Sequence, residues 1–192
     1  MILQTRLGFS LFESGVIILI RLLVSILMFH HGLEKLSDPQ GFTTFVIDKY
    51  FSYLPLSHLH WTYFAAYTQL IASVLVALGI FFRPALISLS MTMLFALVFH
   101  FLDSGFQGAP FAIVEAHNYD FETSGLYLIT YLSLIVTGAG QLSLSHIISR
   151  FVPKTIRWFA WMKLCWIILA FTFFYMHICS WAHLFLHLYL IN

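Results

Sequence analysis

The stretch that decides the fold is residues 61–102, WTYFAAYTQLIASVLVALGIFFRPALISLSMTMLFALVFHFL. It consists of two apolar runs, residues 61–82 and 84–102, which only Arg83 separates. Each run has the length of the ~20 apolar residues that a helix needs to cross a bilayer. Proline is well tolerated in the first turn of a helix, so Pro84 favours a helix that starts at once. These residues predict two membrane helices joined as a tight antiparallel hairpin.

The rest of the chain has a similar composition. Of its 192 residues, 60% are hydrophobic and 9% are charged, and the mean hydropathy is +0.90. Soluble domains carry about a quarter charged residues, so these values exclude a soluble globular protein and a disordered one. Further apolar runs occupy residues 15–32, 123–138 and 158–180. We therefore expect an all-α integral membrane protein, with a four-helix bundle within residues 1–150 and a fifth transmembrane helix within residues 151–192.

Basic residues predict how these helices are oriented, because Lys and Arg collect in cytoplasmic loops. Arg6, Arg21, Arg83 and the basic residues between the fourth and fifth runs fall on one side if the helices alternate. Residues 103–122 contain no Lys or Arg, so this loop lies outside and the amino terminus inside. Arg21 is expected to extend its guanidinium to the nearby headgroups. Residues 181–192 are expected to lie along the outer surface.

Polar side chains concentrate at the outward ends of the predicted helices. All but one of the ten histidines fall in this outward half. Ionisable residues in membrane helices are costly, and they usually face the bundle interior or a wet cavity. Residues three or four apart share a helix face, so His30 or His31 aligns with Glu34, and His100 with Asp103. Histidine is also common at membrane interfaces, so each single histidine has an interfacial explanation as well.

These groups are expected to share one outward vestibule with Gln69 and Glu122. Gln69 lies inside the outer half of the second helix, and Glu122 lies at the amino terminus of the fourth, where the helix dipole favours negative charge. Imidazoles beside carboxylates can relay protons, hydrogen-bond a quinone or an anionic ligand, or hold a metal. We assign catalytic proton handling to His31, His100 and Glu122, and ligand binding to Gln69, Glu34 and Asp103.

Several motifs are missing from the sequence. It has no Cys-x-x-Cys, no phosphate-binding glycine loop, no Gly-x-Ser-x-Gly and no His-Glu-x-x-His. The sequence therefore lacks the motifs required for thiol–disulfide exchange by a paired motif, for nucleotide-driven transport and for the common hydrolase mechanisms. The net charge of +1 argues against nucleic acid as a partner, because duplex binding needs a concentrated basic surface. His183 and His187 share a face and Cys179 extends that row, but the segment lacks the further partner and the flanking pattern of a metal site, so we assign none.

Three segments resemble the DoxX family of small four-helix membrane proteins in order and spacing: RLLVSILMFHHGLEKL, QLIASVLVALGIFFRPALISLSMTMLFALVFH and ETSGLYLITYLSLIVTGAGQLSLSHII. The resemblance covers residues 15–148. The chain departs from the family pattern at Gln69, where members usually have a glutamate. It also departs at the exit of the fourth helix, which usually reads Gly-Pro-Gly-Arg with a later Asp; the differing residues there are Ala139, Gln141 and Ser145.

The resemblance implies a function, because the family name is attached to subunits of thiosulfate:quinone oxidoreductases and of membrane oxidoreductase complexes. We therefore expect a subunit of a quinone-linked redox complex in the bacterial inner membrane. Its vestibule would accept a quinone-like or small anionic substrate. The alternative is an accessory subunit without chemistry, bound to a larger respiratory or transport complex. A metal-handling protein that uses the outward histidines is a third hypothesis. Besides the lipid bilayer, the expected partner is another membrane subunit or a second copy of the chain.

Overall fold

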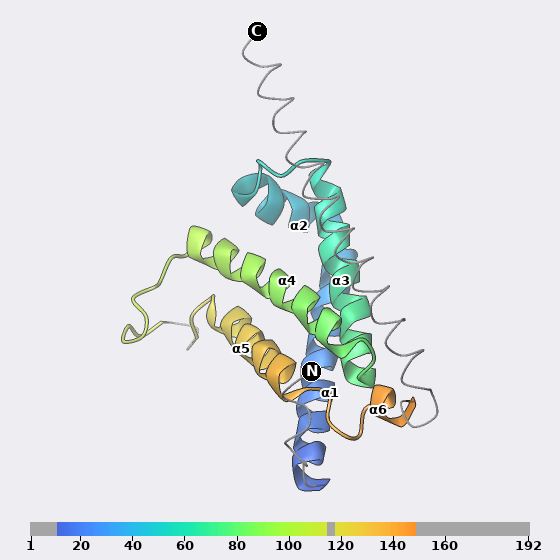
Figure 1. Cartoon of the computed structure of the whole chain (residues 1–192). Helices are drawn as coiled ribbons and strands as arrows, with labels where there is room; N and C mark the ends of the chain where they lie inside the picture. Colours follow the sequence, from blue (N-terminus) through green and yellow to red (C-terminus); the bar gives the residue numbers. More distant parts are fainter. Residues whose placement is uncertain (1–10, 115–117, 149–192) are drawn as a thin grey trace.

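The computed structural model describes residues 11–114 and 118–148, and within them the chain is all-helical (Figure 1). The elements are α1 (Leu11–Ser37), α2 (Pro39–Phe42), the π-helix η1 (Thr43–Asp48), α3 (His58–Leu78), α4 (Phe82–Asp103), α5 (Glu122–Thr137) and α6 (Leu144–Ile148). The predicted fifth helix at residues 158–180 and the segment 181–192 lie outside the described residues.

Three of the described helices are long and apolar enough to cross a membrane: Phe12–Ser37, His58–Leu78 and Phe82–Asp103. The prediction of an all-helical membrane protein is therefore confirmed. The helix α5 has 16 residues, which span about 24 Å against a hydrocarbon core of about 30 Å. It remains a prediction that α5 crosses the bilayer and that a fifth span follows the first four.

The hairpin between α3 and α4 forms as predicted, but α4 begins at Phe82 rather than at Pro84. Gly79 ends α3 with φ of 69°, in the left-handed region where glycine is favoured. The Ile80 backbone N–H donates to the Leu75 carbonyl at 3.0 Å, which closes the turn. The first N–H groups of a helix have no intrahelical acceptor, so a proline in the third position of α4 removes no hydrogen bond.

Helices α1 and α3 lie side by side, and α4 diverges from α3 beyond the turn, with α5 alongside α4 (Figure 1). Gly32 allows the close approach of α1 to α3. A Cβ atom at Gly32 would lie 2.9 Å from the Leu70 side chain and 3.1 Å from the Ala66 carbonyl oxygen. Small residues at such crossings let membrane helices pack by shape.

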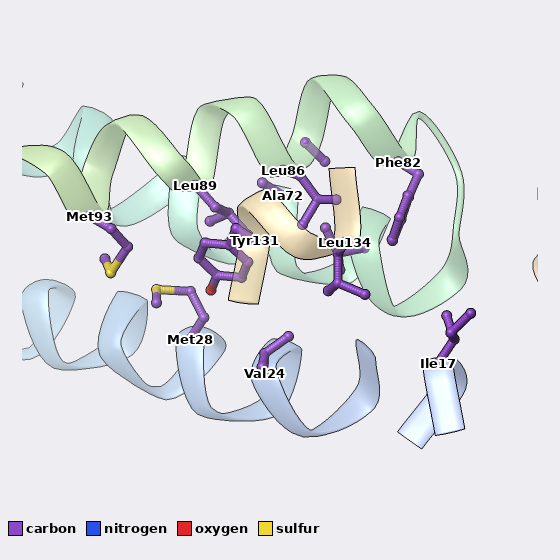
Figure 2. Packing of buried hydrophobic residues seen from close by; sticks show 12 residues of the cluster. Ile17, Val24, Met28, Ala72, Phe82, Leu86, Leu89, Met93, Tyr131 and Leu134 are labelled. Atoms are coloured by element: carbon purple, nitrogen blue, oxygen red, sulfur yellow. The ribbon is translucent and has the colours of Figure 1, made fainter. Parts of the chain in front are cut away.

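The core is built from all four long helices (Figure 2). Tyr131 of α5 points toward Met28 of α1, and both side chains are fully buried. This packing joins α5 to α1 across the bundle. The buried members of the core cluster are Ile17, Val24, Met28, Ala72, Val76, Phe82, Ala85, Leu86, Leu89, Met93, Tyr131 and Leu134.

The loop between α1 and α3 contains a short helical segment, α2 followed directly by η1. Asp38 caps it by accepting a hydrogen bond from the Gly41 N–H at 2.9 Å. A second, smaller core consists of Val46, Ile47 and Phe51, which pack against Trp61 of α3 and Phe99 of α4. The segment therefore covers the outward ends of α3 and α4.

Candidate functional site

Arg21 lies in the bundle interior, so the prediction that it extends to the headgroups was wrong. Its side chain is 1% exposed. Nε donates to the Val76 carbonyl at 3.1 Å, and Nη2 donates to the Ala77 carbonyl at 2.6 Å. Nη1 donates to the Ala139 carbonyl at 2.7 Å, just beyond α5. Carbonyls in the last turn of a helix lack intrahelical donors, and the helix dipole favours a cation there, so this guanidinium gains more by binding them than by reaching water.

The surroundings of Arg21 show how tightly the inward end is closed. A Cβ atom at Gly79 would lie 2.6 Å from Arg21 Nη2 and 2.6 Å from the Cβ of Ser143. The guanidinium also lies 5.4 Å from the centre of the Phe82 ring. Arg21 thus ties α1, the end of α3 and the exit of α5 together, and it belongs to the scaffold of the site.

At the outward end of α1, both histidines reach the same carboxylate. His31 Nδ1 lies 2.8 Å from Glu34 Oε2, and His30 Nε2 lies 3.1 Å from Glu34 Oε1. The His31 ring also meets the Tyr127 ring of α5 edge-on, with 6.1 Å between centroids. These side chains are partly exposed, at 67% for His30, 39% for His31 and 54% for Glu34, so solvent or a ligand can reach the pair.

Gln69 is a buried polar residue of this end. Its side chain is 2% exposed, and its Oε1 atom has no hydrogen-bond partner. The close approach of Gly32 to Leu70 places Gln69 of α3 at about the same level of the bundle as His31 of α1. A buried acceptor left without a donor costs about 1–3 kcal/mol. The amide oxygen is therefore a ready acceptor for a hydroxyl group that enters the bundle.

His100 and Asp103 occupy the outward end of α4. Asp103 accepts hydrogen bonds from the Tyr50 hydroxyl and from Lys49 Nζ, the latter at 3.5 Å. These contacts raise the pKa of Lys49, first through its hydrogen bond with Tyr50 and then through Asp103. His100 is half-buried, and its ring lies 5.0 Å from that of Phe99. Asp103 is thus held by the segment that follows η1.

Glu122 is the first residue of α5 and is exposed. Its Oε2 atom accepts a hydrogen bond from the Tyr119 backbone N–H at 3.3 Å, so the carboxylate supports the loop just before the helix. The pairing of α4 with α5 brings Glu122 to the same end of the bundle as His100. Their chain neighbours Phe121 and Phe101 have ring centroids 5.1 Å apart.

The predicted site residues therefore form two groups rather than one connected cluster. The first is His31, Glu34 and Gln69 on α1 and α3, and the second is His100, Asp103 and Glu122 on α4 and α5. Within residues 11–114 and 118–148, no hydrogen bond or ion pair joins the two groups. In the same part of the chain, no cluster of three or more His, Cys, Asp or Glu side chains could hold a metal ion.

Tyr127 is the site residue that the sequence interpretation missed. It extends the first group to α5 through its contact with His31. Its only signal in the sequence is the spacing to Tyr131, four residues on, which puts two phenols on one face of an apolar helix. Such pairs are common in packing faces, so the spacing alone does not indicate a site.

Residues 16–101 match the family model of DoxX. This part of the chain is similar to the DoxX family. The match confirms the resemblance seen in the sequence, and it runs from α1 into the last turn of α4, so that His31, Gln69 and His100 fall inside it. No curated protein and no solved structure is significantly similar to the chain. The DoxX match and the three apolar helices together identify a multi-pass membrane protein embedded in the lipid bilayer.

Proposed function

We propose that this DoxX protein is a subunit of a quinone-linked redox complex in the bacterial inner membrane. The observation that carries the proposal is the unpartnered Oε1 atom of Gln69, buried at the level of the His31–Glu34 pair. In lipid there is no bulk water to satisfy such an atom, so a ligand hydroxyl that donates to it would bind favourably. A quinol carries such a hydroxyl on a lipid-soluble body, and the amide would orient it.

The residues around Gln69 can move a proton. An imidazole can both accept and donate a proton through its two ring nitrogens, and His31 already shares a hydrogen bond with Glu34 at 2.8 Å. When electrons from thiosulfate reduce the quinone, His31 would therefore take up a proton on the side of the exposed Glu34 carboxylate and deliver it on the bundle side to the quinone oxygen, which becomes the quinol hydroxyl that donates to Gln69. In the proposal, His100 and Glu122 handle protons at the ends of α4 and α5, and Asp103 helps to shape the entrance.

The proposal includes the topology predicted from the sequence. The amino terminus lies in the cytoplasm, α5 is the fourth membrane crossing within a bundle of residues 1–150, and residues 151–192 add a fifth. The basic residues before α1 and at the hairpin support this orientation, since both positions then face the cytoplasm. The polar groups described above would face the outer leaflet.

The function is tested by substitution in the native membrane complex. Gln69→Leu keeps the volume similar and removes the acceptor, and we expect the apparent affinity for quinol to fall about tenfold, the equivalent of one lost hydrogen bond of ~1.4 kcal/mol. His31→Gln should lower turnover of quinone-coupled thiosulfate oxidation more than it changes affinity. Gln40→Leu, an exposed glutamine outside the site, is the matched control and should leave both values unchanged.

The result that would contradict the catalytic assignment is also clear. Suppose that the variants of His31, His100 and Glu122 assemble at the level of the native protein. If their turnover and affinity are then unchanged, the catalytic assignment is wrong. The membrane architecture would stand, because it depends on none of these side chains.

The second candidate is a non-catalytic accessory subunit, and a specific observation favours it. Large apolar side chains are exposed on each of the long helices, such as Phe12 at 80%, Ile71 at 60% and Val136 at 71%. Helices in lipid associate through packing and polar contacts, so such ridges suit a partner membrane protein or a second copy. Co-purification in mild detergent with a stoichiometric partner, combined with full activity of the Gln69→Leu complex, would favour this role.

A further inference from the structure

A groove of about 480 Å³ lies between α3 and α4. Beyond the hairpin turn the two helices diverge (Figure 1). Aromatic side chains form its walls, namely Phe64 and Tyr67 from α3 and Phe81 from the hairpin turn. Its floor is made of the small buried residues Ala72 and Ala85. A hollow with small residues at its base and bulky ones at its sides is the shape that accepts the side-chain ridge of another helix.

The inward end of this groove lies beside the point where the described chain ends. Leu75 and Pro84 line the groove on either side of the hairpin turn at Gly79. Ser143 packs directly on Gly79, and α6 starts at the next residue. Figure 1 accordingly shows α6 beside the turn between α3 and α4. The chain therefore leaves the described bundle close to the inward end of the groove.

The sequence beyond α6 contains a segment suited to this groove. Residues 158–180 are apolar over a length that can cross a bilayer, and they begin ten residues after Ile148. Ten extended residues reach at most about 36 Å, so the segment starts near α6. We propose that residues 158–180 pack against α3 and α4 and fill this groove. The inference goes beyond the proposed function and does not depend on it.

A tethered segment has an advantage over other occupants. A short linker holds it at an effective concentration in the millimolar range, which a second copy of the chain does not reach in a membrane unless it binds tightly. Acyl chains are flexible and lose conformational freedom when they are held in a groove, whereas a helix enters it with its backbone already ordered. The tethered segment is therefore favoured as the occupant of the groove over a second copy of the chain and over lipid acyl chains.

Disulfide crosslinking tests this packing, because the segment contains a native cysteine, Cys165. A disulfide needs Cα atoms within about 7 Å, so it reports close neighbours only. Cys165 lies seven residues into the segment, about 10 Å deep, which matches the depth of Ile71 in α3. The full-length protein carries Cys179→Ser together with one new cysteine in the groove: Thr68→Cys, Ile71→Cys or Leu75→Cys.

Matched controls place the new cysteine on other faces of the bundle. Leu19→Cys on α1 and Val136→Cys on α5 are 66% and 71% exposed, against 60% for Ile71. After mild oxidation in native membranes, peptide mass spectrometry should find disulfides within one chain between Cys165 and Ile71→Cys, or one of the groove variants one turn away. Their yield should be at least fivefold higher than the yield of disulfides with either control. Equal crosslinking to a control, no crosslinking along the groove, or disulfides only between two chains would each overturn the proposal.

A second variant distinguishes specific packing from chance collision. Ser88 lines the groove from α4 and is exposed, so Ser88→Trp fills space without touching the core. We expect it to reduce the Ile71→Cys disulfide with Cys165 at least fivefold, whereas Leu19→Trp should leave the yield unchanged. An undiminished yield in Ser88→Trp would show that the segment lies elsewhere. Neither substitution alters His31, Gln69 or Glu34, so this test and that of the proposed function fail independently.

Discussion

At the scale of single residues, the described part of the chain holds a buried cation, Arg21, and a buried amide, Gln69, with different roles. Arg21 has all three types of donor nitrogen bound to carbonyls from α3 and from the exit of α5. Gln69 has a buried oxygen bound to nothing. A satisfied group stabilises the scaffold, whereas an unsatisfied one is available to a ligand. This contrast supports a structural role for Arg21 and the proposed ligand contact of Gln69.

The role of Arg21 predicts that even a conservative substitution is destabilising. Lysine keeps the charge but lacks the planar fork that reaches three carbonyls at once, so Arg21→Lys should cost about 2 kcal/mol. For a chain of this size that corresponds to a thermal midpoint lower by roughly 4–8 °C, measured by circular dichroism in nanodiscs. Arg83→Lys is the control, because Arg83 makes one long bond of 3.4 Å. Equal shifts in the two variants would contradict the structural role of Arg21.

At the scale of elements, the turn between α3 and α4 fixes the angle at which the two helices diverge. Gly79 has a positive φ and lies against both Arg21 and Ser143. Gly79→Ala should therefore lower stability by about 1–3 kcal/mol, since it strains the backbone and displaces the guanidinium. Gly15→Ala in α1 is the opposite case, because a Cβ atom there meets nothing within 4 Å. Thermal unfolding of both variants should show a loss for the first and no loss for the second.

The segment from α2 to Phe51 shows how a short element is held by tertiary contacts. The Thr43 and Thr62 hydroxyls share a hydrogen bond of 2.6 Å, which joins it to α3. The contacts of Tyr50 and Lys49 with Asp103 join it to α4. A helix this short is marginal by itself, so these contacts rather than local propensity position it over the outward end.

At the scale of the whole molecule, the orientation in the bilayer can be tested directly. With both native cysteines replaced by serine, Asn118→Cys lies before α5 and Leu142→Cys lies after it, and both positions are exposed. If α5 crosses the membrane with the amino terminus inside, an impermeant maleimide should label Asn118→Cys in intact spheroplasts and Leu142→Cys only after lysis. Labelling of both in intact cells would show that α5 does not cross.

The sequence by itself determined the membrane class, the long helices, the tight hairpin and the DoxX resemblance, because hydropathy, helix length and Pro84 act locally. Only the tertiary structure decided that Arg21 binds carbonyls inside the bundle, that Tyr127 meets His31, and that the site residues form two groups. The physical reason is that lipid-facing side chains are as apolar as those of the core. Periodicity therefore does not tell which face of a membrane helix points inward, and packing alone assigns each polar group its neighbours.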